Sequence, residues 1–154
     1  YNDFSWDFML AYYNRSGLVA AVSGKVKAIL EGMNVSKEEY VLVPIAIQDS
    51  NTQHYLLFIK SIGHDEIDFS NSLYRKILGD DEYRKFASYS EFSASPESYT
   101  IASPVLPQKY AKRDLIYIQN GAETYISARL IEAFREAGIK GISFHSIGTL
   151  RFSI

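Results

Sequence analysis

The chain has 154 residues, of which 47% are hydrophobic and 22% charged, and this length and composition are typical of one globular domain with a single core. Sixteen basic and eighteen acidic residues give a net charge of -2, which excludes the broad positive field that nucleic acid or anionic lipid would require. The absence of cysteine excludes disulfides, thiolate metal ligands and a cysteine nucleophile, and it favours a reducing compartment, for which the cytoplasm is the default.

Aromatic residues are most concentrated near the N-terminus. The group comprises Phe4, Trp6, Phe8, Tyr12 and Tyr13. We expect most of these side chains to pack in the core or on an edge strand, whereas a tryptophan or tyrosine left at the surface would be a natural interface anchor. Trp6, Tyr12 and Tyr13 are therefore candidates for a partner interface. Because the chain begins at Tyr1, the presence of an upstream segment such as a signal peptide stays open.

A repeated pattern links two distant segments, residues 17–30 and 121–134, which align without a gap. Each copy has a glycine, then an aliphatic residue directly before a serine, then a basic residue two places on and apolar residues three, six and seven places on. The serines, Ser23 and Ser127, are predicted to cap the first turns of two helices. The apolar spacing forms one stripe along each helix, so each helix is expected to pack one face against a sheet.

The segment after the first copy is of β type. Residues 40–47 and 54–60 are apolar and rich in β-branched and aromatic side chains, and the turn-rich residues 48–52 separate them, so they are predicted to form a hairpin. Pro44 has no N–H to donate to a ladder, which favours an edge position or a bulge for the first of these strands.

The middle of the chain gives four shorter predictions. Residues 80–86 are predicted to form a small helix, because their acids come first and their basic residues last. The serine-rich residues 88–98 are predicted to form a mobile loop. Residues 99–105 and 114–118 alternate or run apolar, which is typical of strands.

Only one cluster in the sequence offers acid–base or metal chemistry. Of the three histidines, His64 alone has carboxylates close by, those of Asp65, Glu66 and Asp68. A transition-metal site requires two or three converging histidines, and a hard-cation loop requires further oxygen ligands, whereas this run stops at Phe69. We therefore assign no metal ligands. The chemical alternative that stays open is a small metal-dependent enzyme centred on these four residues.

The same cluster is explained by a solvated turn in which Asp68 accepts hydrogen bonds from backbone N–H groups or from the hydroxyl of Ser70 or Ser72. Its acids could also meet a basic partner surface, so Asp65, Glu66 and Asp68 are candidates for a partner interface. The sequence contains no serine-hydrolase elbow and no glycine-rich phosphate loop. We assign no catalytic and no cofactor-binding residues, and we expect the protein not to be an enzyme.

Three passages carry a resemblance to known families: residues 16–30, residues 54–60 leading to 67–74, and residues 125–144. The last contains a helix that begins Ser-x-Arg-Leu, an Ala-Gly pair, a further glycine and a strand, and the second contains a strand followed by Ile-Asp and a serine. In these passages the chain resembles the immunity protein 43 and immunity protein 11 families of bacterial polymorphic toxin systems. The resemblance implies a cytoplasmic antitoxin-like protein that neutralises a cognate toxin by binding it, and it supplies no catalytic residues.

We expect one α+β domain over residues 1–154, with a mixed or mostly antiparallel sheet that carries the helices of two repeat units, about residues 16–47 and 120–147. The second helix is predicted to end at Gly138, before a strand over residues 142–147. No apolar run approaches the roughly 20 residues of a membrane-spanning helix, so no membrane partner is expected, and the net charge argues against nucleic acid. The resemblance implies a toxin protein as the partner. No cofactor is expected. A structural module of a larger assembly is the further alternative.

Overall fold

The computed structural model describes residues 6–14, 17–48, 51–119, 123–145 and 150–153. By contact the chain divides into two compact units. The first comprises Tyr1–Ser61, Arg113–Tyr117 and Tyr125–His145, and the second comprises Ile62–Lys112, Ile118–Thr124 and Ser146–Ile154. The single domain predicted from the sequence stays a prediction, and each unit is described by itself.

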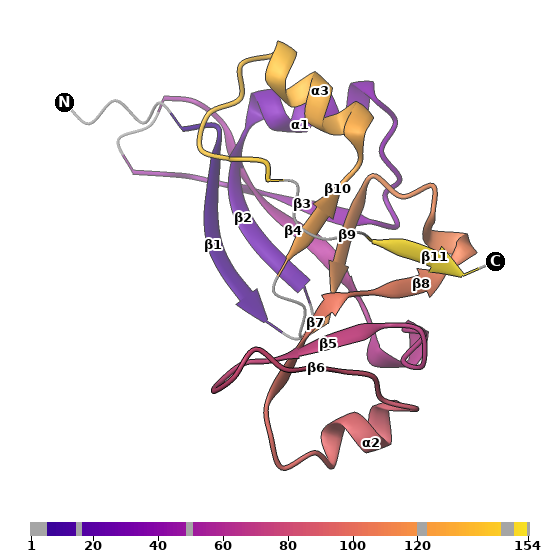
Figure 1. Ribbon diagram of the computed structural model, residues 1–154. Helices are drawn as coiled ribbons and strands as arrows, with labels where there is room; N and C mark the ends of the chain where they lie inside the picture. The colour runs from indigo at the N-terminus through magenta and orange to yellow at the C-terminus, as the bar shows by residue number, and fades with distance from the viewer. Residues whose placement is uncertain (1–5, 15–16, 49–50, 120–122, 146–149, 154) are drawn as a thin grey trace. The chain divides into compact units, whose positions relative to one another are not determined.

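The first unit is built on a six-stranded sheet in the order β1-β2-β4-β9-β10, with β3 also paired to β4 (Figure 1). Its strands are β1 (Phe8–Asn14), β2 (Gly17–Ser23), β3 (Tyr40–Ile45), β4 (His54–Ile62), β9 (Leu115–Ile118) and β10 (Thr124–Ile126). The pairs β1–β2, β2–β4 and β3–β4 are antiparallel. With the helices described next, these strands confirm the predicted α+β class.

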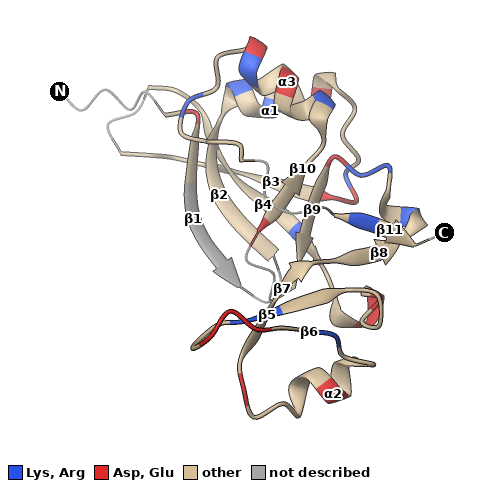
Figure 2. Cartoon of the chain, viewed as in Figure 1, with Lys and Arg blue, Asp and Glu red and all other residues tan. Residues whose placement is uncertain are grey.

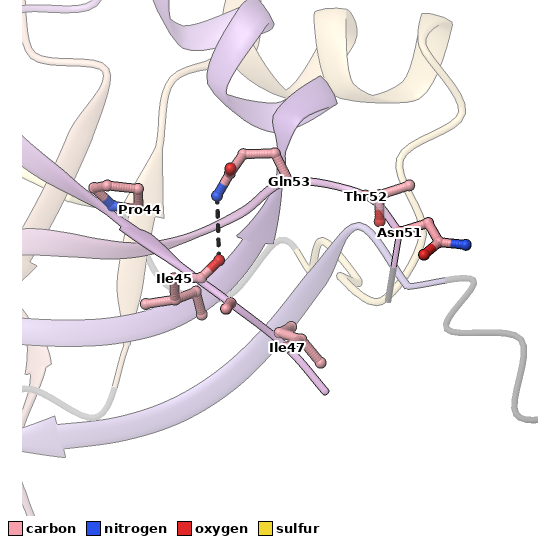
Figure 3. A pocket seen from close by; sticks show the side chains of 7 residues that line it. Pro44, Ile45, Ile47, Asn51, Thr52 and Gln53 are labelled. Carbon is pink, nitrogen blue, oxygen red and sulfur yellow. Dashed lines mark hydrogen bonds between the residues drawn. The ribbon is translucent and has the colours of Figure 1, made fainter. Parts of the chain in front are cut away.

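The predicted hairpin is β3–β4, in which Val41 lies opposite Phe58. Among the strands that the structure describes, β3 pairs with β4 alone, so the edge position predicted from Pro44 is confirmed. At the loop end of the hairpin, the side-chain amide of Gln53 donates to the carbonyl oxygen of Ile45 over 3.1 Å (Figure 3). Strands β7 (Tyr99–Ser103), β8 (Val105–Pro107) and β9 confirm the two strand predictions in the second half of the chain.

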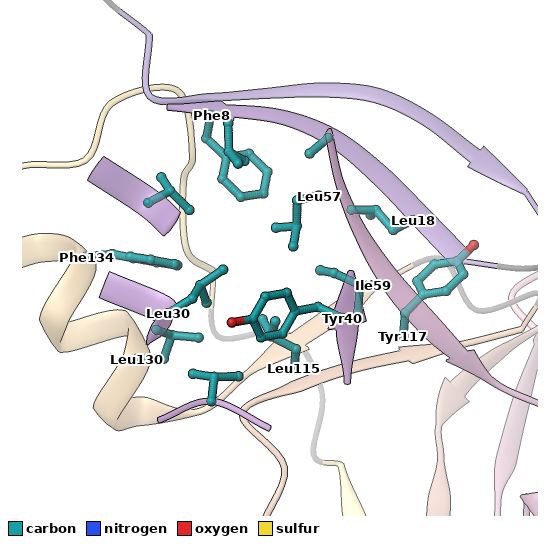
Figure 4. Close-up of a cluster of buried hydrophobic side chains, with 14 residues drawn as sticks. Phe8, Leu18, Leu30, Tyr40, Leu57, Ile59, Leu115, Tyr117, Leu130 and Phe134 are labelled. Carbon is teal, nitrogen blue, oxygen red and sulfur yellow. The ribbon is translucent and has the colours of Figure 1, made fainter. Parts of the chain in front are cut away.

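Two nine-residue helices, α1 (Gly24–Gly32) and α3 (Ala128–Glu136), cover one face of the sheet (Figure 1). Each buries the residues that the apolar spacing predicts, because positions three and seven after the serine lie on one side of a helix. They are Val26 and Leu30 in α1, and Leu130 and Phe134 in α3. These side chains join Leu57 and Ile59 of the central strand and others in the apolar core (Figure 4).

The two helix starts differ, which limits the repeat. The hydroxyl oxygen of Ser127 accepts a hydrogen bond from the N–H of Leu130 over 3.3 Å, so this predicted cap is confirmed. The Ser23 prediction is wrong, because its hydroxyl donates to the carboxylate of Asp7 over 2.8 Å and makes no cap. The helix end at Gly138 is confirmed, since this glycine follows α3 with a φ of 62°. That the two segments, about residues 16–47 and 120–147, are copies of one repeat stays a prediction.

The second unit contains a three-stranded sheet in the order β6-β5-β7, formed by β5 (Leu73–Lys76), β6 (Tyr83–Arg84) and β7. Strand β8 pairs in parallel with β11 (Arg151–Ser153). The remaining elements are α2 (Tyr89–Ser93) and two short 3-10 helices, η1 (His64–Glu66) and η2 (Gln108–Tyr110). Five rings pack next to one another with neighbouring centroids 5.1 to 5.5 Å apart, and they account for part of the aromatic content: Phe69, Tyr74, Phe86, Phe92 and Tyr99.

Three secondary-structure predictions are wrong. Residues 80–86 form no helix, because Tyr83 and Arg84 pair with β5 and Phe86 is buried among rings. The predicted loop at residues 88–98 contains α2, whose first turn is capped by the Ser88 hydroxyl accepting from the N–H of Glu91. The described part of the predicted strand at 142–147, residues 142–145, is not a strand, and residues 146 and 147 lie outside the described residues.

Candidate functional site

The histidine–carboxylate cluster lies on η1 and the turn after it. The His64 ring is buried and stacks on the ring of Tyr89, with centroids 4.3 Å apart and an angle of 21° between the planes. A hollow of about 360 Å³ adjoins this stack, and Asp65, Asp68 and Ser88 contribute to its lining.

The carboxylate of Asp68 is used to hold the turn together. It accepts from the Ser70 hydroxyl over 2.8 Å, from the Asn71 N–H over 3.2 Å and from the Asn71 side-chain amide over 2.8 Å. These bonds, that of the Asn71 amide above all, hold the pKa of Asp68 below its ordinary value because they stabilise the charged form. The Ser72 hydroxyl donates to the Asp68 carbonyl oxygen. The predicted solvated turn is therefore confirmed.

The other two acids of the cluster point to different surroundings. Asp65 is exposed, and its carboxylate lies close to Gly63. Glu66 forms an ion pair with Lys109 over 2.6 Å, and the Lys109 ammonium also lies over the ring of Tyr110. Throughout the described ranges, no group of three or more His, Asp or Glu side chains is placed to hold a metal ion. A metal centre at this cluster would require these side chains to rearrange.

The N-terminal candidates fall in the first unit. Trp6 is 55% exposed and its indole lies beside Gly141, while Asp7, Ser23, Lys25 and others line a hollow of about 430 Å³ next to it. Tyr12 and Tyr13 lie in β1, but their side chains are outside the described part of the chain, as is Phe4. The exposure of Trp6 suits an interface anchor, and its role in binding stays a prediction.

A buried carboxylate network in the first unit was missed in the sequence. Asp114 accepts from the Ser127 hydroxyl over 2.5 Å and from the Arg129 guanidinium through both Nε, over 2.8 Å, and Nη2. Burial alone would raise the pKa of Asp114, but the bonds from Arg129 and Ser127 outweigh it and hold that pKa below its ordinary value. The Ser-x-Arg pattern at the start of α3 is the signal that could have found this network.

Glu39 is the second buried carboxylate, and it accepts from the backbone N–H groups of Asp114 and Leu115 over 2.9 and 2.8 Å. Burial raises the pKa of Glu39, and these two bonds offset the rise only in part. Arg129 also donates to the carbonyl oxygen of Met33 over 3.2 Å. Since every group in the network bonds to the chain itself, we assign it to stability and not to chemistry.

Exposed apolar side chains gather on strands of the first unit. Val41, Val43 and Phe58 are all more than one-third exposed, and the β3–β4 register brings them to the same face of the hairpin. At the loop end of this hairpin, Pro44, Ile47 and Thr52 help to line a hollow of about 510 Å³ (Figure 3).

A second exposed group lies on the turn between β5 and β6 in the second unit. Leu78 is 75% exposed, Ile77 56% and Tyr83 51%. Asp80 and Asp81 follow the apolar pair, and the acids of this turn are shown red in Figure 2. The sequence carried the signal, because an apolar pair directly before a glycine and three acids is unusual in a turn. The helix predicted for residues 80–86 rests on the acids and leaves the apolar pair out.

The described helices include none that is long and apolar enough to cross a membrane. Comparison of the chain with protein-family models, with curated proteins and with solved structures finds no match.

Proposed function

We propose that this protein is an immunity protein, which neutralises a cognate bacterial toxin in the cytoplasm by direct protein–protein binding and without a cofactor. The observation that carries the proposal is the placement of large apolar side chains at the surface of paired strands. Val41, Val43 and Phe58 occupy one face of the β3–β4 hairpin, where they remain more than one-third exposed. Clustered apolar exposure of this kind marks an interaction surface, whereas single exposed residues do not.

A stoichiometric binder requires a rigid surface and apolar or aromatic anchors, because ordering a flexible surface on binding costs affinity. The β3–β4 hairpin supplies the rigid surface through the hydrogen bonds between its strands and through the bond from the Gln53 side chain to the Ile45 carbonyl oxygen. The resemblance to the immunity protein 43 and immunity protein 11 families supplies the kind of partner. The candidate residues Trp6 and Asp65 add an exposed indole and an exposed carboxylate that a basic toxin could meet, whereas Glu66 is paired with Lys109.

Titration of the purified protein into the product of the gene directly upstream of its own, which the proposal predicts to contain a toxin domain, tests the proposal. The expected result is a one-to-one complex with a Kd on the order of nanomolar or tighter, as a neutralising inhibitor requires. The double variant Val41→Ser and Phe58→Ser should weaken binding, while Glu132→Gln and Glu136→Gln, on exposed positions of α3, serve as the control. A purified toxin domain that shows no complex with the wild-type protein would refute the proposal.

A further inference from the structure

The turn between β5 and β6, residues 77–83, is the most exposed apolar feature of the second unit, and we call it the β5–β6 tip. Leu78, the most exposed large hydrophobic residue that the structure describes, lies at its start. Ile77 comes directly before it, and Tyr83 begins the returning strand. Three large apolar side chains within seven residues leave more apolar surface in water than a solvated turn ordinarily does.

The tip is held in place by three strands and not left as a loose loop. The N–H of Lys76 donates to the carbonyl oxygen of Glu82 over 2.9 Å and closes the turn, and the N–H of Ile77 donates to the carbonyl oxygen of Ser98 over 2.9 Å. Gly79 has a φ of 99°, a backbone conformation that other residues adopt only at a cost. The tip is therefore preorganised, which reduces the entropy lost when a partner binds it.

Side-chain contacts also hold the two ends of this turn in place. The Lys76 ammonium pairs with Glu97, which precedes β7, and lies 3.7 Å from the carboxylate of Glu82, which precedes β6. The Tyr99 hydroxyl is hydrogen-bonded to both carboxylates, over 2.9 Å to Glu97 and 3.4 Å to Glu82. Both ends of the turn are thus tied to the neighbouring strand.

The charged side chains of the tip itself, residues 77–83, are all acidic, whereas basic side chains flank it on the two strands: Arg75, Lys76, Arg84 and Lys85. Glu82 is paired with Lys76, but among the described residues Asp80 and Asp81 take part in no ion pair, and both are exposed. At the end of the turn, carboxylates outside any ion pair lie beside the apolar side chains, where they disfavour phosphate backbones and anionic lipid headgroups and attract cationic protein surfaces. This charge pattern selects a basic protein as the occupant.

We infer that the β5–β6 tip is an anchor for a basic protein surface, with Leu78 and Tyr83 inserted into the partner and Asp80 and Asp81 facing its cationic rim. The inference rests on the proposed function and deepens it: the partner is the cognate toxin, and the surface that it presents is basic. Apolar anchors at the centre of an interface carry most of the affinity, while the carboxylates at its edge speed association.

Surface plasmon resonance against the toxin domain of the neighbouring gene tests the inference. Leu78→Ser and Tyr83→Ala are each expected to raise Kd by about tenfold or more, chiefly through faster dissociation. The pair Asp80→Asn and Asp81→Asn is expected to slow association by about tenfold at low salt and to flatten its salt dependence. The matched control is Glu132→Gln with Glu136→Gln, which removes two exposed acids from α3.

A second measurement needs no variant. Amide hydrogen exchange on the wild-type complex should show protection of the peptide that spans residues 77–83. Tip variants that bind as tightly as wild type, or unchanged exchange at the tip in the complex, overturn the inference and leave the proposed function standing. A wild-type protein that does not bind the toxin domain at all overturns both.

Discussion

Asp114 receives two hydrogen bonds from the guanidinium of Arg129, and this pair joins the residue before β9 to the first turn of α3. Because Arg129 also donates to the carbonyl oxygen of Met33 at the end of α1, the Asp114–Arg129 pair links the sheet to both of the helices that cover it. The pair is asymmetric: Asp114 is buried, whereas the Arg129 side chain remains about half exposed.

Replacing Asp114 with alanine is expected to lower the free energy of unfolding by about 1–3 kcal/mol, because a buried acceptor for three hydrogen bonds is lost while Arg129 can turn to water. Urea denaturation measures the change. The control is Glu31→Gln, which removes an exposed ion pair with Lys27 and should leave stability unchanged. Equal effects of the two variants would contradict the assignment of the network to stability.

The two buried carboxylates are expected to respond to pH in opposite directions. Burial raises the folded-state pKa of Glu39, so the folded state binds this proton more tightly, and the contribution of Glu39 to stability is lost as pH rises from about 4.5 through its folded pKa. The bonds from Arg129 and Ser127 lower the pKa of Asp114 despite its burial, so its contribution is lost only as pH falls below about 3.8.

When the pH is raised from about 4.5 to neutrality, the unfolding free energy of the Glu39→Gln variant should therefore fall less than that of wild type, because the variant has no carboxylate to ionise at residue 39. Thermal or urea unfolding of both proteins at several pH values gives the comparison. Parallel pH profiles for the two proteins would show that Glu39 does not ionise at a cost in the folded state.

Gly17 lies where β2 passes β4, and a Cβ added there would overlap the carbonyl oxygen of Ile59. Gly17→Ala is expected to cost about 1–3 kcal/mol of unfolding free energy, since the strands must move apart. Gly32 at the end of α1 is the matched control, because a Cβ there meets no atom within 4 Å. Gly32→Ala should be neutral or stabilising by up to about 1 kcal/mol. A tolerated alanine at residue 17 would contradict the strand register.

The two repeat serines should behave differently when replaced with alanine. Ser127→Ala removes a cap and a bond to Asp114, so hydrogen exchange in the first turn of α3 should accelerate by about fivefold, equivalent to about 1 kcal/mol. Ser23→Ala removes a bond to Asp7 and should affect the residues before β1 more than α1 itself. Equal fraying of both helices would support the capped repeat that the structure contradicts at Ser23.

Local patterns were sufficient for much of the fold. The spacing of Val26 and Leu30, and of Leu130 and Phe134, predicts both long helices and their buried faces because these positions share one side of a helix. The β3–β4 hairpin follows from two apolar runs around a polar turn, and the edge position of β3 follows from Pro44. These features depend on neighbours in the sequence.

Features that depend on distant residues were missed. Ser23 is a suitable cap by sequence, but Asp7 takes its hydroxyl, and nothing near Ser23 in the chain announces that contact. Residues 80–86 have helix-like charges, yet pairing with β5 and burial of Phe86 override that preference. For α2 the signal existed, because Ser88 and Glu91 have capping-box spacing and Glu91 accepts from the N–H of Ala87.

The candidate site shows the same division. The turn around Asp68 was predictable because its partners, Ser70 and Asn71, are two and three residues away. The pairing of Glu66 with Lys109 and the stacking of His64 on Tyr89 join distant segments, so the sequence could not show that the acids of this cluster separate.

Because the acids of the His64 cluster are separated, we expect metal ions not to stabilise the protein. Zn²⁺ or Ca²⁺ added at millimolar concentration should leave the melting temperature of the protein unchanged, since a ligand stabilises the folded state only when it binds there. Differential scanning fluorimetry with and without a chelator measures it. A rise that is abolished in His64→Ala would instead favour the metal-dependent alternative.

The most direct test of immunity is growth of bacteria that express the toxin domain of the neighbouring gene together with this protein. The account predicts that the wild-type protein restores growth, that the tip variants Leu78→Ser and Tyr83→Ala restore it less, and that the control with Glu132→Gln and Glu136→Gln restores it fully. Continued killing in cells that accumulate soluble wild-type protein would contradict the account.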